Sequence, residues 1–163
     1  MGTNLIKQVI IFVFFILLQV LVLDNIMIFG MFNPILYTLP IILMPRNTST
    51  PALMFLAMMQ GGLIDIFNDT LGINAAASIL LAFVRNPLLS LVDTDQIGGD
   101  NKSYAPIKLP LAQYAMYICP IIFLHHLALY SLEAFSFSNI ISILLNSTLN
   151  AILTVIILII FKK

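Results

Sequence analysis

The chain has 163 residues, of which 61% are hydrophobic and 9% are charged, and its seven acidic and seven basic residues cancel to a net charge of zero. A soluble domain carries about 25% charged residues, so this composition excludes an ordinary water-exposed surface. A near-zero charge without a basic patch argues against nucleic acid as a partner. The single cysteine, Cys119, excludes a disulfide framework and a cysteine metal site.

Long apolar runs dominate the sequence, and crossing the hydrocarbon core of a bilayer takes about 20 helical residues. The runs predict an all-α membrane protein, a single domain over residues 1–163 with six transmembrane helices. The expected spans are about 5–23, 26–45, 51–67, 71–92, 109–132 and 140–161. The first run continues past its end into Asp24 without a small-residue cleavage site, which indicates an uncleaved helix.

The second span is expected to be irregular. Asn33-Pro34 resembles a helix N-cap followed by proline at the first helical position. Pro40 would then kink the helix. The pattern leaves open one kinked span or a shorter, re-entrant helix. The fourth span is expected to be interrupted near Arg85-Asn86-Pro87, with Arg85 extending to the headgroups.

Charge position predicts the orientation. With six spans, all the bases fall on the side of the N-terminus: Lys7, Arg46, Arg85, Lys102, Lys108, Lys162 and Lys163. The opposite loops carry Asp24, Asp69 and Glu133. By the positive-inside rule, both termini and the polar connection 93–108 are expected in the cytoplasm of a multi-pass plasma (inner) membrane protein.

Two polar residues near the outer ends of helices are candidate sites. Asp65 follows Gly61-Gly62, which permit close approach of another helix. Its carboxylate would either bind a partner or ligand in an outward cavity, or cap a neighbouring helix. Gln19, in the first helix, would contact another helix of the bundle or a helix of a partner.

The last two spans carry polar side chains at helical spacing. His126, Tyr130 and Glu133 are separated by four and then three residues, so they share one face. We expect a polar network there, with a structural role or, alternatively, as a proton relay. The final helix has a polar stripe that would join it to the bundle or line a cavity: Asn139, Ser142, Asn146, Asn150 and Thr154.

Known catalytic patterns are missing from the sequence. It has no Gly-rich phosphate loop with lysine, no metal-ligand cluster and no nucleophile–base arrangement. The sequence therefore predicts a protein that is not an enzyme and needs no cofactor or metal. An intramembrane enzyme, whose residues would converge only in the folded chain, is the alternative that the missing motifs disfavour.

Four groups of residues resemble the bacterial rod shape-determining MreD family. They are Leu18-Gln19-Val20-Leu21, Asn33-Pro34, Gly61-Gly62-Leu63-Ile64-Asp65 with Leu71-Gly72, and His125-His126 with Leu132-Glu133-Ala134-Phe135. The resemblance covers most of the chain in order, except 93–108. It implies Gln19, Gly61, Gly62, Asp65 and Gly72 as positions that line an outward cavity or contact a helix.

The resemblance also implies a function and a set of partners. The expected function is a non-catalytic scaffold or regulator of the cell-wall elongation (rod) complex, which maintains cell shape during peptidoglycan synthesis. The expected partner is an MreC-like single-span protein, with MreB, RodA and its transpeptidase acting indirectly, in contact with membrane lipid. A homodimer and a hetero-oligomer both remain open.

A transport function is the alternative. The MreD fold is similar to the substrate-binding subunits of energy-coupling-factor transporters, which would bind a small molecule near Asp65. Such subunits present small residues on the first helix to a coupling protein. Residues 5–23 contain no Gly, Ala or Ser, which counts against this alternative.

Overall fold

A computed structural model describes residues 2–26, 33–92, 105–135 and 139–162 of the chain. All regular structure in these ranges is helical. The long helices are α1 (Gly2–Leu21), α3 (Thr50–Asn68), α4 (Ile73–Val92), α5 (Leu111–Ala134) and α6 (Ile140–Phe161). Five stretches of the described residues are long and apolar enough to cross a membrane. The chain is thus an all-α, multi-pass membrane protein.

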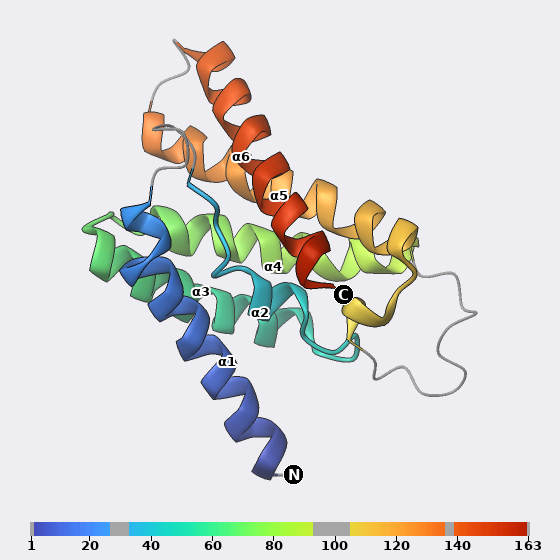
Figure 1. Ribbon diagram of the computed structural model, residues 1–163. Helices are drawn as coiled ribbons and strands as arrows, with labels where there is room; N and C mark the ends of the chain where they lie inside the picture. The colour runs from blue at the N-terminus through green and yellow to red at the C-terminus, as the bar shows by residue number, and fades with distance from the viewer. Residues whose placement is uncertain (1, 27–32, 93–104, 136–138, 163) are drawn as a thin grey trace.

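The helices pack largely in chain order. α3 packs against α4, α4 against α5, and α5 against α6, while α1 contacts α3 and the short helix α2 (Leu39–Ile42) (Figure 1). The core between them is apolar and includes Leu53, Ala57, Leu81 and Ile118. α6 and α1 therefore lie at the two margins of the bundle.

The first helix is the least buried of the candidate spans. Only 11% of its most apolar window is buried, against 33–39% for the others. Ile10 and Phe14 are more than half exposed, and so is Leu21. Because these side chains are apolar, lipid rather than water suits this surface.

Of the two forms expected for the second span, one long kinked helix is absent from its described part, which holds a short helix instead. Residues 33–38 form no helix, and α2 has only four residues. Pro34 therefore starts no helix. Pro40 does not kink one either, since it lies in the first turn of α2, where its missing N–H is not needed. Residues 27–32 lie outside the described ranges.

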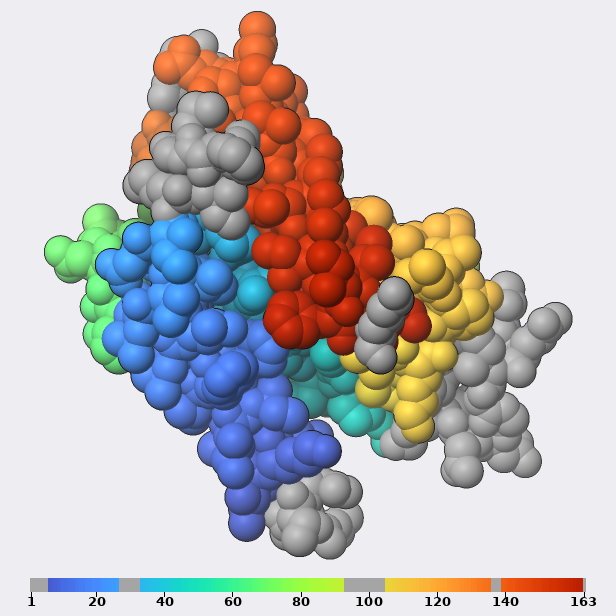
Figure 2. Space-filling view, viewed as in Figure 1, coloured from blue at the N-terminus to red at the C-terminus, as the bar shows by residue number. Residues whose placement is uncertain are grey.

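Residues 33–45, called here the 33–45 segment, run antiparallel to α1. Near the start of the segment, the Gln19 side chain accepts a hydrogen bond from the Leu36 N–H at 2.8 Å. Near its end, Pro45 lines a cleft together with Gln8. In the space-filling view a strip of this segment shows between α1 and α6 (Figure 2).

Two expectations for the fourth span are also wrong. α4 continues as a helix through Pro87. Arg85 does not extend to the surface, because its side chain is 0% exposed. Its guanidinium donates to the Met44 carbonyl and, at 2.7 Å, to Asn86 Oδ1. The Asn86 side chain donates in turn to the Thr48 carbonyl at 3.1 Å. These bonds connect this part of α4 to the backbone of Met44 and Thr48.

Charges separate between the two ends of the bundle. The described acids follow the C-terminal ends of α1 and α3 or lie in the last turns of α3 and α5: Asp24, Asp65, Asp69 and Glu133. The described bases lie at the opposite ends of the helices: Lys7, Arg46, Arg85, Lys108 and Lys162. We call these the acidic end and the basic end. Residues 93–104, most of the expected polar connection, are outside the described ranges.

Candidate functional site

A polar cavity of about 290 Å³ opens at the acidic end. It lies among α1, the start of the 33–45 segment, α3, α4 and α5. Its lining residues are Gln19, Asp24, Asn33, Ile35, Tyr37, Ile64, Asn68, Thr70, Ile73, Asn74, Leu129, Tyr130 and Glu133. Three of the candidate site residues line this cavity: Gln19, Tyr130 and Glu133.

Asp24 joins three parts of the chain across this cavity. It lies in the short helix η1 (Leu23–Asn25). Its Oδ1 accepts hydrogen bonds from Gln19 Nε2 at 2.7 Å and Asn33 Nδ2 at 3.2 Å. Its Oδ2 accepts one from Asn68 Nδ2 at 2.8 Å. The carboxylate thereby links α1, the 33–45 segment and α3.

Gln19 is buried and holds the 33–45 segment by its backbone. Its Nε2 donates to the Pro34 carbonyl at 3.3 Å, in addition to the bond from the Leu36 N–H to its Oε1. Residues 33–36 form no helix, so their backbone groups need such side chains at membrane depth. Of the two interpretations of Gln19, these contacts describe the one within the bundle.

Side chains of other helices also form hydrogen bonds to backbone groups of the 33–45 segment. The Asn33 and Ile35 N–H groups donate to Asn150 Oδ1 at 2.9 Å and Thr154 Oγ1 at 3.3 Å. Gln60 Nε2 donates to the Tyr37 carbonyl. The hydroxyl of Tyr117 donates to the Ile42 carbonyl at 3.0 Å. Every long helix thus contributes a polar side chain to this one stretch of backbone.

Asp65 lies behind the cavity wall and caps α4. Its Oδ1 accepts from the Asn74 N–H and Asn74 Nδ2, both at 3.0 Å, and from the Thr70 hydroxyl. Its Oδ2 accepts from the Ala75 N–H at 2.9 Å. These are N–H groups of the first turn of α4, which have no partner inside the helix. The carboxylate is 5% exposed, so the cavity meets its partners Thr70 and Asn74 instead.

The three candidate glycines differ in their surroundings. A Cβ on Gly61 would lie 2.5 Å from the Asn74 carbonyl oxygen and 2.6 Å from Ala75 Cα, so close approach of α4 requires glycine here. A Cβ on Gly62 would meet nothing within 4 Å. Gly72 has a φ of +87°, a left-handed conformation that suits the turn before α4.

A buried chain of hydrogen bonds that we did not expect from the sequence links α5 to Asp65. The Asn74 amide must present its Nδ2 to the carboxylate, so its Oδ1 accepts from the Tyr37 hydroxyl at 3.0 Å. That hydroxyl also lies 3.2 Å from His125 Nε2. Because the Tyr37 hydroxyl donates its one proton to Asn74, the imidazole proton belongs on His125 Nε2, which donates to the Tyr37 oxygen and leaves Nδ1 without a partner. The amide of Asn74 interrupts this chain as a proton path.

Nothing local in the sequence marks these three residues as a group. Tyr37 and Asn74 are 37 positions apart, and Tyr37 and His125 are 88 apart. The one available signal was that an imidazole inside a span needs a polar partner.

His126 points to a different partner from its neighbour. Its Nδ1 donates to the Ile122 carbonyl at 2.9 Å, so its Nε2 is the acceptor of the Thr154 hydroxyl, 3.4 Å away. The His126 and Tyr130 rings are 6.4 Å apart. No hydrogen bond among the described residues joins His126, Tyr130 and Glu133 to one another. The three residues do share one face of α5, but the His126 imidazole is buried and the Glu133 carboxylate is exposed.

The polar stripe of α6 divides between both expected roles. Asn150 and Thr154 bond to the 33–45 segment. The other three line a second cavity of about 380 Å³ beside Tyr130 and Glu133: Asn139, Ser142 and Asn146.

The side chains around the 290 Å³ cavity can bind a ligand through hydrogen bonds. Among the described residues, its lining has two carboxylates, Asp24 and Glu133, and no lysine, arginine or histidine. Asn33 Oδ1 is a buried acceptor without a partner. The described residues contain no group of three His, Cys, Asp or Glu side chains that could hold a metal ion. Acceptors outnumber donors, so the cavity favours a group that carries N–H or O–H donors.

Comparison with known proteins gives no relative. No protein-family model matches the sequence, no curated protein matches it, and no solved structure matches the fold.

Proposed function

We propose that this chain is a non-catalytic membrane scaffold of the bacterial cell-wall elongation machinery, as the resemblance to the MreD family implies. In this proposal its α1 surface docks the transmembrane helix of an MreC-like single-span protein. The proposal includes six crossings of the inner membrane, with the second made by residues 26–45, and a fold of the kind found in energy-coupling-factor substrate-binding subunits.

The exposed α1 surface is the observation that supports this proposal. Among the α-helices of the described chain, α1 makes its main contacts with α3 and α2. An apolar groove of about 270 Å³ lies between α1 and α3. Val9 and Val13 line it from α1, and Met59 and Leu63 line it from α3. Apolar grooves beside a weakly packed helix suit helix–helix packing, which drives association in membranes.

The internal use of the polar groups also supports a scaffold. Gln19, Asp65 and Asn74 bond to the protein itself, where they hold the 33–45 segment and the start of α4. A residue engaged in this way stabilises the bundle and has little capacity left for a substrate.

Orientation belongs to the same proposal. The basic end would face the cytoplasm and the acidic end the outside, by the positive-inside rule. Lys7 and Lys162, near the two ends of the chain, would then both be cytoplasmic.

Purification from native membranes in a mild detergent, followed by mass spectrometry, tests the proposal. Recovery of a single-span protein with a large extracytoplasmic domain is expected. Substitution of Val13 by Phe in the α1–α3 groove should reduce that recovery, whereas Ile156→Phe on the exposed side of α6 should not. Co-purification of transport ATPases and a coupling membrane subunit instead would contradict the scaffold proposal.

The cavity at the acidic end favours a second candidate, a small-molecule-binding subunit of a transporter of the energy-coupling-factor type. Its volume of about 290 Å³ admits a small metabolite. Its acceptor-rich lining would select one with amine or hydroxyl donors. A bound compound released on denaturation of the purified protein, and lost in Asp24→Asn, would favour this candidate.

A further inference from the structure

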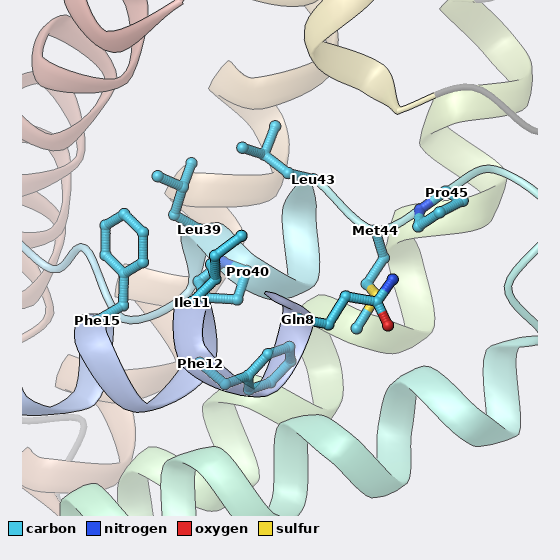
Figure 3. A pocket seen from close by; sticks show the side chains of 9 residues that line it. All are labelled: Gln8, Ile11, Phe12, Phe15, Leu39, Pro40, Leu43, Met44 and Pro45. Carbon is cyan, nitrogen blue, oxygen red and sulfur yellow. The ribbon is translucent and has the colours of Figure 1, made fainter. Parts of the chain in front are cut away.

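A narrow apolar cleft adjoins the α1–α3 groove and lies between α1 and the 33–45 segment (Figure 3). Its volume is about 120 Å³. The side chains that line it are Gln8, Ile11, Phe12, Phe15, Leu39, Pro40, Leu43, Met44 and Pro45. All of them except Gln8 are apolar.

The shape of the cleft restricts what can occupy it. From Gln8 to Phe15 it follows α1 for about 10 Å, at 1.5 Å per residue. A transmembrane helix is about 10–12 Å across with its side chains, too wide for this volume. A single hydrocarbon chain is narrow enough to enter the cleft. In a bilayer, the acyl chains of lipids surround this surface.

The charge beside the cleft restricts the occupant further. Lys7 directly precedes Gln8 and Arg46 directly follows Pro45, so two bases are next in the chain to residues that line the basic end of the cleft. Lys7 is exposed. No acid of the described chain lies at this end. A negatively charged headgroup complements this arrangement, whereas a zwitterionic headgroup does so less well.

We propose that the cleft between α1 and residues 39–45 binds one acyl chain of an anionic phospholipid, whose phosphate lies beside Lys7 and Arg46. This site is separate from the cavity at the acidic end and does not depend on the scaffold function. Lipid bound here would fill the gap on the weakly packed side of α1 and so fix the angle of α1 against α2.

Tryptophan fluorescence can test this site directly, because the chain contains no tryptophan. Phe15→Trp places a single indole in the cleft, and Phe14→Trp places one at nearly the same depth on the exposed side of α1. Each variant is reconstituted into phosphatidylcholine vesicles that contain a small fraction of brominated phosphatidylglycerol or, in parallel, brominated phosphatidylcholine. Bromine quenches indole only at close range.

The expected result is stronger quenching of Phe15→Trp by brominated phosphatidylglycerol than by brominated phosphatidylcholine. Two nearby bases would enrich the anionic lipid by about fivefold each. Phe14→Trp should show no such preference. Adding Lys7→Gln and Arg46→Gln to Phe15→Trp should remove the preference, and raising the salt concentration should weaken it without any substitution.

Three results would overturn the proposal. Equal quenching by the two lipids at Phe15→Trp would mean no selection for the headgroup. An equal preference at Phe14→Trp would mean a general layer of anionic lipid around the protein. A preference that survives both high salt and the loss of both bases would assign the headgroup elsewhere.

Discussion

Gly61 and Gly62 are adjacent in α3 but face different surroundings. A methyl group on Gly61 would contact the backbone of α4 at 2.5–2.7 Å, and backbone cannot move aside as a side chain can. Gly61→Ala should therefore push α3 from α4 and destabilise the protein by about 1–3 kcal/mol. Gly62→Ala is the matched control: with no neighbour within 4 Å, it should be neutral or stabilise the helix slightly. Thermal unfolding in detergent measures both. Equal midpoints for the two variants would contradict the predicted contact.

Asp65 caps α4, whereas Asp69 does not. Replacing each by asparagine removes one negative charge, so a comparison of the two variants isolates the effect of the cap. Asp65→Asn replaces an acceptor oxygen by an NH₂ group that faces N–H donors, so we expect destabilisation of about 1–2 kcal/mol. Asp69 is exposed and left-handed, with a φ of 55°, a conformation that asparagine accepts readily. Asp69→Asn should leave the unfolding midpoint unchanged. An unchanged midpoint for Asp65→Asn would show that the cap contributes little.

At the scale of elements, the 33–45 segment depends on side chains from other helices. Thr154→Val keeps the shape of the side chain but leaves the Ile35 N–H and His126 Nε2 without their partner. We expect a loss of about 1 kcal/mol or more. Thr148 is exposed on the same helix, and its hydroxyl bonds only to the Leu144 carbonyl of that helix. Thr148→Val is therefore the control. The same unfolding measurement applies, and a Thr154→Val variant as stable as the control would mean that the bond to the segment is dispensable.

The same element shows where prediction from sequence succeeds and where it stops. Hydropathy located α1, α3, α4, α5 and α6 to within a few residues, because each is a long apolar run. Residues 26–45 have a similar composition, yet the described part holds only the four-residue helix α2. Its conformation is stabilised by Asn150 and Thr154, which lie 117 and 119 positions away from their partners. No local pattern carries that information.

For the candidate site, the sequence identified important residues but not their contacts. Polar residues inside a span are unusual, and this alone drew attention to Gln19, Asp65 and His126. The sequence left open whether Asp65 caps a helix or meets a ligand, because that depends on where α4 begins relative to α3. Arg85 was misplaced for a related reason: its buried acceptors are backbone carbonyls of the 33–45 segment, which an ordinary helix would not have offered.

For the whole molecule, the number of crossings can be tested by labelling. Cys119→Ala removes the only cysteine. Asn25→Cys and Asn47→Cys then place single thiols at exposed positions before and after the 33–45 segment. If residues 26–45 cross the membrane, a membrane-impermeant maleimide should label Asn25→Cys on intact cells and Asn47→Cys only after lysis. Labelling of both from the same side would exclude a crossing by this segment.

The separation of charge between the two ends gives the molecule a preferred direction in an electric field. In the proposed orientation the exposed acids Asp69 and Glu133 lie outside and Lys7 lies inside. A resting potential, negative inside, contributes about 2.3 kcal/mol for each charge carried across 100 mV. The potential of an energised cell would therefore draw the acidic loops outward during insertion and hold the basic end back. Dissipating that potential while the chain is being inserted should slow the translocation of these loops, even though the finished bundle needs no energy source to remain folded.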